Sequence, residues 1–396
     1  MINKFGSLFA GHVDMDNVGL GGTAVNDRWF SNEHLLTAFD KGQALCQLMD
    51  RAGYDTFWTA EHHFQREGYE CFPNILLYSL HLAHVTTNIK LGCAFNVTPM
   101  WNPLRLAEVF AMVDYLTGGR VIFGVGRGYH TREVEVFDSP LRDQAANRDL
   151  FEEQVDVIFK ALNEESFSHH GKHFDFPPAG IPYRGYELEN ITLVPRPVHR
   201  PIECWQPIQS ATQRGLDFMV KHGIKGIIGG GVAEGGPGQK IVESWTDANA
   251  RAGKEIKPGE DLIIGFHFQI AETKEKAIKE ASKWYEENLK MFGPLRMVRG
   301  MTEEQIRDIG DPKRAPHAGF APLEQFAQGG TWLYGPPEQI IEQLLEVEAR
   351  LPGLEHVDVS HPIGTPQSVM LEQLEWFAKD VMPAFKDRVA TPPVAA

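Results

Sequence analysis

Short apolar runs alternate along the chain with stretches in which apolar residues recur every three or four positions. The first pattern predicts β-strands and the second predicts amphipathic helices. Strands are expected at residues 4–9, 55–59, 89–95, 121–125, 202–205, 224–228, 262–271 and 357–360. Helices are expected at residues 33–52, 74–85, 103–116, 148–162, 212–222, 239–252, 274–291, 337–350 and 368–385. This order of about eight strand–helix units is typical of a TIM (β/α)8 barrel.

Two stretches interrupt the alternation. Residues 167–201 carry His169, His170 and His173 and several prolines, which indicates an excursion with its own short hairpin. Residues 292–328 are rich in Gly, Pro and Arg and lack periodicity. We therefore expect one α/β domain over residues 1–396, a TIM barrel with insertions at about 165–200, after strand 4, and at about 292–330, after strand 7. A doubly wound open sheet is the alternative, but no G-x-G-x-x-G follows the first strand.

Composition and charge argue against several classes of function. The 396 residues include 38 basic and 53 acidic side chains, and the net charge of −15 disfavours non-specific binding to nucleic acid or to an anionic membrane. No apolar run approaches the ~20 residues of a membrane span, and the first residues lack the order of a secretion signal. The four cysteines are widely spaced without a C-x-x-C pair, so a reducing cytoplasm is the expected location.

In a TIM barrel the chemistry lies on loops at the carboxyl ends of the strands. Glu61, His62 and His63 follow the second predicted strand, and a histidine titrates near neutral pH, which suits proton transfer. Adjacent histidines in extended backbone point in opposite directions, so at most one faces the barrel mouth. One packed and one solvated histidine is an equally good interpretation. The spacing of an H-E-x-x-H motif is absent, so we expect no metal site.

Three further strand ends carry candidate cofactor contacts. The third strand is followed by Ala94, Phe95 and Asn96. These residues would let a flat ring approach the backbone, or they would form only a plain turn. A glycine-rich segment with a forked phosphate donor follows the fourth strand: Arg127, Gly128 and Tyr129. Polar side chains precede the helix after the fifth strand, where free amides attract anions: Gln209, Ser210 and Thr212. A structural arginine and an ordinary helix cap are the alternatives to a phosphate site.

Three segments resemble the bacterial luciferase-like monooxygenases, and the alkanal-monooxygenase subunits in particular. They are residues 56–64 (TFWTAEHHF), 102–105 (NPLR) and 118–128 (GGRVIFGVGRG). The resemblance implies a TIM barrel with insertions, usually dimeric, that binds reduced FMN delivered by a separate flavin reductase. It also implies activation of O₂ as a flavin C4a-peroxide.

The resemblance assigns roles to individual positions. His62 matches the family's acid/base histidine near the flavin, and His63 matches its supporting neighbour. Arg127 matches the arginine that binds the FMN phosphate, while Ser210 and Thr212 match the hydroxyl-bearing start of the phosphate-binding helix.

Two further positions match the flavin ring site. Ala94–Phe95 matches a non-prolyl cis peptide under the isoalloxazine ring, although Phe95 is larger than the small residue expected there. Gly126 stands where luciferase has a reactive cysteine, so light emission from an aldehyde is not expected.

These observations predict a two-component monooxygenase that uses reduced FMN and O₂ on a small or medium apolar organic substrate. Residues 292–328 are well placed to form a lid that keeps water out. The alternatives are a deazaflavin-dependent hydride-transfer enzyme, a non-catalytic flavin-binding partner subunit and, more remotely, a metal-dependent hydrolase. The sequence does not specify the substrate or the type of oxygenation.

Overall fold

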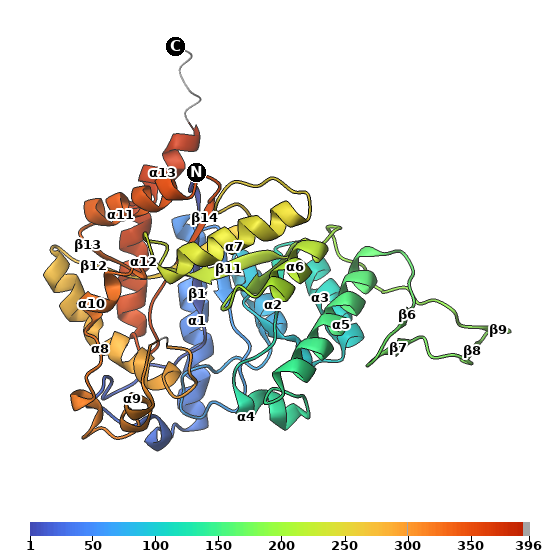
Figure 1. The fold of residues 1–396 in the computed structure, drawn as a ribbon, viewed down its shortest axis with the longest axis horizontal. Helices are drawn as coiled ribbons and strands as arrows, with labels where there is room; N and C mark the ends of the chain where they lie inside the picture. Colours follow the sequence, from blue (N-terminus) through green and yellow to red (C-terminus); the bar gives the residue numbers. More distant parts are fainter. Residues whose placement is uncertain (299, 391–396) are drawn as a thin grey trace, which may run out of the picture.

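A closed barrel of eight parallel strands forms the centre of the molecule (Figure 1). The computed structural model describes residues 1–298 and 300–390. The barrel strands are β1 (Lys4–Phe9), β2 (Thr56–Thr59), β3 (Lys90–Cys93), β5 (Val121–Gly126), β10 (Cys204–Pro207), β11 (Lys225–Gly229), β12 (Leu262–Ile270) and β14 (His356–Ser360). Each pairs with the next in this order, and β14 pairs with β1 to close the ring. The predicted TIM barrel is confirmed.

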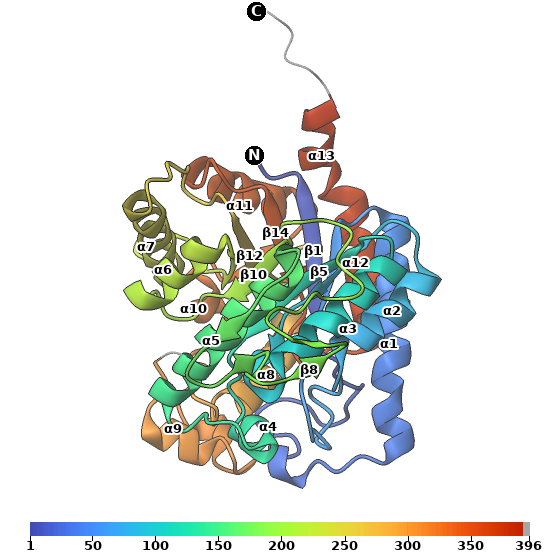
Figure 2. The same cartoon turned by 90° about the vertical axis from the view of Figure 1, so that its right-hand side faces the viewer.

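Helices surround the strands (Figure 2). They are α1 (Asn32–Ala52), α2 (Ile75–Val85), α3 (Pro103–Leu116), α5 (Gln144–Asn163), α6 (Gln213–His222), α7 (Pro237–Arg251), α11 (Pro337–Arg350) and α12 (Gln367–Asp380). Local sequence sets where several of them begin. Asn74 caps α2, Asn102 caps α3 ahead of Pro103, and Asp143 caps α5, each by accepting a hydrogen bond from a backbone N–H of the first turn.

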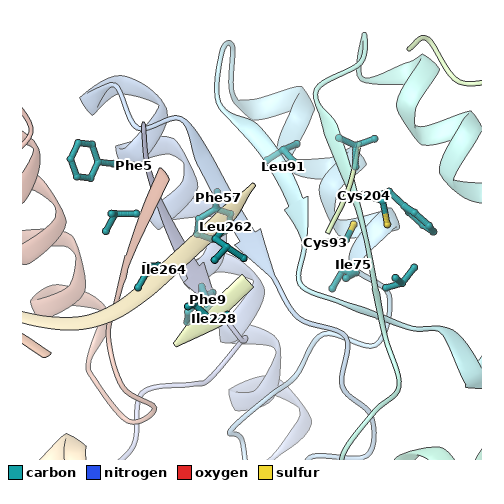
Figure 3. Packing of buried hydrophobic residues seen from close by; sticks show 14 of the residues in the cluster. Phe5, Phe9, Phe57, Ile75, Leu91, Cys93, Cys204, Ile228, Leu262 and Ile264 are labelled. Atoms are coloured by element: carbon teal, nitrogen blue, oxygen red, sulfur yellow. The ribbon is translucent and has the colours of Figure 1, made fainter. Parts of the chain in front are cut away.

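Alternation along each strand separates an outer core from an inner one. Phe57 and Leu91 point outward into the layer between strands and helices, part of which Figure 3 shows. Trp58 points inward and packs with Trp205, its ring centroid 6.1 Å away, and with Ile263. This inner cluster fills the barrel, so the interior is packed and offers no channel through the molecule.

The first insertion leaves the barrel between α5 and β10 and extends away from it (Figure 1). It forms two short antiparallel pairs, whereas the sequence predicted one hairpin. The pairs are β6 (His169–His170) with β7 (Asp175–Phe176), and β8 (Pro182–Tyr183) with β9 (Tyr186–Glu187).

The second insertion follows β12 and has more regular structure than its composition predicted. It follows α8 (Lys274–Phe292) and contains α9 (Glu303–Asp308), α10 (Leu323–Ala327) and β13 (Trp332–Gly335). β13 pairs in parallel with the carboxyl-terminal half of β12, beyond the barrel. A separate apolar cluster holds these elements together, with Trp284, Ile309 and Trp332 among its members.

Several predicted boundaries were wrong for identifiable reasons. The strand predicted at 89–95 ends at Cys93, and the chain resumes as a separate strand, β4 (Asn96–Val97), which pairs with β5. The strand predicted at 202–205 lies two residues later. The helix predicted at 368–385 is two helices, since α12 ends before α13 (Pro383–Ala390), and a proline inside a helix removes a backbone donor.

A cavity of about 730 Å³ opens at the amino-terminal end of the barrel. Its lining includes the ion pairs Lys4–Glu355, Lys90–Glu203 and Lys225–Asp261. Barrel enzymes place their chemistry at the opposite end, so this cavity is not the candidate active site. Among the described residues, no helix is both long and apolar enough to span a membrane.

The inner core generates a test of packing. A Cβ at Gly92 would lie 2.0 Å from Cε3 of Trp58, so we expect Gly92→Ala to lower the free energy of unfolding by at least ~1–3 kcal/mol. Gly229→Ala is the control, because a Cβ there meets nothing within 4 Å, and its effect should stay near ~0.5 kcal/mol. Urea denaturation measures both. Equal stability of the two variants would contradict this account of the barrel interior.

Candidate active site

The candidate site is formed by the loops that follow β2 and β5 at the carboxyl-terminal end of the barrel. The loop after β2 carries Glu61, His62 and Glu70, and the loop after β5 leads into the short helix α4 (Thr131–Val134). Figure 1 shows α4 and α9 at the end of the barrel away from the amino terminus.

His62 is the centre of a buried polar cluster. Its side chain is only 5% exposed, and its two ring nitrogens face different partners. Nδ1 lies 3.1 Å from Oε2 of Glu133, and Nε2 lies 3.2 Å from Oε1 of Glu70. The Tyr129 hydroxyl lies 3.2 Å from Nε2 and donates a 2.6 Å hydrogen bond to Glu70.

The carboxylates decide the charge of His62. Burial disfavours the imidazolium, but the negative charges of Glu70 and Glu133 outweigh this effect and raise the pKa of His62 to about 9. Burial opposes the ionisation of Glu133 as well, yet its hydrogen bond to His62 keeps the pKa of that carboxyl below its usual value. Burial and the nearby Glu70 carboxylate raise the pKa of Tyr129 well above its usual value. At neutral pH the cluster therefore holds a proton on His62.

Two more side chains complete the cluster. Nε2 of His130 lies 3.0 Å from Oε2 of Glu70, so both oxygens of this carboxylate are engaged. The Gln65 amide donates a 2.9 Å hydrogen bond to Glu133. The sequence analysis did not identify Gln65, Glu70, His130 or Glu133, because no spacing rule connects them with His62. Closure of the barrel brings the β2 and β5 loops together.

The other two predicted acid/base candidates lie beside His62 but hold different partners. The Glu61 carboxylate accepts hydrogen bonds from the backbone of Val97 (2.6 Å) and from the Trp101 indole (2.9 Å). His63 turns the other way, with Nε2 3.3 Å from Glu61 and its ring 4.9 Å from that of Phe137. The hydrogen bonds from Val97 and Trp101 to Glu61 fix the adjoining loop in place.

The segment after β3 has the backbone geometry that the resemblance implies. The Ala94–Phe95 peptide is cis. It packs against the glycines of β5, since a Cβ at Gly126 would lie 3.2 Å from Cβ of Phe95. Asn96 is buried and donates a 2.8 Å hydrogen bond to the carbonyl of Gly124, which ties the segment to the neighbouring strand.

Arg127 follows β5 directly and has different partners from the histidine cluster. Its guanidinium donates a 3.2 Å hydrogen bond to Asn147, and burial together with repulsion from Arg148 lowers its pKa. Gly128 allows the chain to turn here, because its φ is +79° and a Cβ would lie 2.6 Å from the Val134 side chain. Arg148 is a second cation that the sequence analysis did not single out.

The start of α6 adjoins Arg148. A Cβ at Gly215 would lie 3.0 Å from Oγ1 of Thr212 and 3.3 Å from Nη1 of Arg148. The Thr212 hydroxyl and the Arg148 guanidinium therefore both lie close to Gly215. Thr212 is the N-cap residue of α6, but its side chain makes no capping hydrogen bond. Gln209 and Ser210 are exposed in the loop that leads to it. The first N–H groups of α6 therefore remain available to an anion.

Comparison with known proteins supplies the deciding observation. The family model for luciferase-like monooxygenases matches residues 13–352 of this chain. The chain belongs to this family. The match includes the histidine cluster, Arg127 and the start of α6.

Individual relatives agree with this assignment. The oxygenase component of the flavin-dependent trigonelline monooxygenase of Acinetobacter baylyi is 26% identical over 356 residues, which cover 88% of this chain and 90% of that protein. Three other curated relatives match over shorter stretches that cover 38% to 46% of their own length.

Solved structures share the fold. The oxygenating constituent of 3,6-diketocamphane monooxygenase from Pseudomonas putida, in complex with FMN, has a TM-score of 0.69 at 19% identity and covers 97% of this chain and 99% of its own. The coenzyme F420-dependent tetrahydromethanopterin reductase of Methanopyrus kandleri has a TM-score of 0.66 at 18% identity, with 98% and 100% covered.

The raised pKa of His62 predicts a pH effect on stability. Because the folded-state pKa of about 9 exceeds the unfolded value of ~6.5, the imidazolium stabilises the fold fully below pH ~6.5 and this contribution is lost as pH rises through 9. Urea unfolding at pH 6, 8 and 10 should show that the wild type loses stability with pH relative to His62→Gln. Parallel pH profiles of the two proteins would show that His62 is not held as a cation.

Proposed function

We propose that this protein is the oxygenase component of a two-component system. It takes reduced FMN from a separate flavin reductase and uses O₂ to oxygenate a small or medium apolar organic substrate. One observation carries the proposal: a single loop after β5 contributes Arg127 to a cationic pocket and Tyr129 and His130 to the His62 cluster. One elongated anionic cofactor would span both ends.

The cationic pocket fits the FMN phosphate. Two guanidinium groups, Arg127 and Arg148, repel each other there, and the nearest anionic partner of Arg148, Glu152, is 3.6 Å away. A phosphate between them would relieve this repulsion and would accept hydrogen bonds from the start of α6. The absence of a side chain at Gly215 leaves the space open. Ser210 and Thr212 would contribute hydroxyl groups.

The other end fits the flavin ring. The cis peptide at Ala94–Phe95 lies against strand β5, where Gly124 and Gly126 have no side chains. We propose that the isoalloxazine ring lies over this backbone. With glycine at position 126, the chain offers no thiol at the place where luciferase has its reactive cysteine.

Bound reduced FMN would supply the electrons that activate O₂. His62 holds a proton and is shielded from water, so it can donate that proton from Nε2 to an oxygen atom of the reaction. The Tyr129 hydroxyl and Glu70, both beside Nε2, provide a route for its return. Glu133 fixes the ring by binding Nδ1.

Aromatic side chains near the site favour an apolar substrate. Phe64 and Phe137 are exposed, and their rings stack at a centroid distance of 5.7 Å next to His63. The second insertion begins beside the site, since Phe292, the last residue of α8, has its ring 6.3 Å from that of Tyr129. We propose that this insertion acts as a lid over the substrate and keeps water from the reaction.

A homodimer completes the proposal. Large apolar side chains are exposed along α2 and α3: Leu77, Met112, Tyr115 and Leu116. Such a face is typical of an interface that a twofold axis closes with its own copy. The described cysteines are all unpaired, which suits the cytoplasm as the location of both enzyme and reductase.

Cofactor binding and turnover should respond to different variants. Arg127→Ala and Arg148→Ala should each weaken binding of reduced FMN by ~10–100-fold, since each removes a charge-assisted contact of ~1.5–3 kcal/mol. His62→Gln should bind FMN normally but lower turnover by ~10²–10⁴-fold. Anaerobic titration and oxygen-consumption assays over a substrate panel measure both quantities. Arg105→Ala, an exposed arginine on α3 paired with Glu108, is the control.

Three outcomes would contradict the proposal. Unchanged FMN affinity in both arginine variants would remove the phosphate site. Saturation by a reduced deazaflavin in place of reduced FMN would assign the protein to hydride transfer, the chemistry of the F420-dependent neighbour. Tight FMN binding without turnover of any substrate would favour a non-catalytic subunit.

The dimer has its own test. Replacing Met112 and Leu116 together by Asp should convert the dimer into a monomer, because the charges would be buried in the interface. Size-exclusion chromatography with light scattering measures the mass. Leu345→Asp on α11, also an exposed apolar position, should leave the mass unchanged. A wild type that is monomeric at micromolar concentration would refute the dimer.

A further inference from the structure

The cluster around His62 has a second chemical capacity. Four side chains with metal-ligating atoms meet there: His62, Glu70, His130 and Glu133. One ligand atom from each lies within 4.8 Å of the others, and no side chain of the four is more than about a tenth exposed. Unlike a surface cluster of acidic residues, this set pairs two imidazoles with two carboxylates in a pocket shielded from water.

Glu70 is the centre of the inner set. Its Oε1 lies 3.2 Å from Nε2 of His62, and its Oε2 lies 3.0 Å from Nε2 of His130. Ligand atoms bound to one ion at ~2.0–2.2 Å are themselves about 3 Å apart. Each imidazole nitrogen therefore already lies at ligand spacing from one oxygen of Glu70, as in a 2-His-1-carboxylate set whose carboxylate binds through both oxygens.

Glu133 supports this set from outside. It holds Nδ1 of His62 at 3.1 Å, and this contact directs Nε2 toward Glu70. A carboxylate that binds the far nitrogen of a ligating histidine is a regular feature of metal sites, where it fixes the ring orientation. Gln65 in turn donates to Glu133, and the Tyr129 hydroxyl donates to Glu70.

We propose that His62, His130 and Glu70, with Glu133 behind His62, bind one divalent transition-metal ion. Two imidazoles with carboxylate oxygens suit Zn²⁺, Fe²⁺ or Mn²⁺, whereas Mg²⁺ and Ca²⁺ prefer oxygen ligands alone. A bound ion would replace the proton on Nε2 of His62, which is released to solvent, and its two charges would neutralise the two buried carboxylates. The sequence analysis expected no metal site, because no spacing along the chain connects His62 with Glu70, His130 and Glu133.

The metal site and the proposed flavin reaction share one nitrogen atom. Nε2 of His62 cannot bind an ion and transfer a proton at the same time, so the ion would act as an inhibitor of turnover. The proposal does not depend on the flavin function, because metal binding can be measured with no flavin present.

The test is equilibrium dialysis of the full chain, first treated with a chelator and then exposed to Zn²⁺, with the metal measured by mass spectrometry. The wild type should retain one ion per chain. Glu70→Gln and His130→Gln should each weaken retention by at least ~10-fold, and Glu133→Gln by ~10–100-fold. Glu67→Gln and His63→Gln are the matched controls, since they alter a carboxylate and an imidazole in the same loop outside the cluster.

Cobalt gives a readout that needs no variant. Co²⁺ added to the wild type should produce the visible absorption of a nitrogen- and oxygen-ligated ion, and Zn²⁺ should abolish it by displacement. No ion retained by the wild type, or equal retention in the wild type, Glu70→Gln and His130→Gln, would overturn the proposal. FMN titration of the same samples separates the two proposals, because Arg127 and Arg148 lie outside the metal cluster.

Discussion

Two carboxylates buried beside one histidine constrain the rest of the site. Glu70 and Glu133 are each 1% exposed, and a buried negative charge is costly unless it is paired. His62 provides the positive charge, while Tyr129 and His130 provide further hydrogen bonds. This requirement fixes the ring of His62 in one orientation, which is what an acid/base group needs.

The same requirement connects the two halves of the site. Gly128, with its positive φ, separates Arg127, which lies near Arg148, from Tyr129 and His130, which both contact Glu70. The cationic pocket and the proton-holding cluster therefore depend on one short segment. The β2 and β5 loops meet at one end of the barrel, because β2 and β5 lie on either side of β3.

The sequence predicted the barrel and part of the site. The eight strands were found because buried parallel strands are apolar and bounded by turn residues. His62 and Arg127 were found because they directly follow predicted strands and match a known family. Glu70 and Arg148 were not found, since a carboxylate in a loop and an arginine in an amphipathic helix look like ordinary solvated residues until the fold brings their partners close. The strand β13 was also not predicted, because its four residues are too few to show a period.

The most direct test of the account is a crystal structure of the protein with FMN bound. We predict that the phosphate lies between the guanidinium groups of Arg127 and Arg148 at the start of α6. The ring should lie over the Ala94–Phe95 peptide, within reach of the His62 side chain. A flavin bound at the amino-terminal cavity, or one whose phosphate contacts neither arginine, would contradict the account.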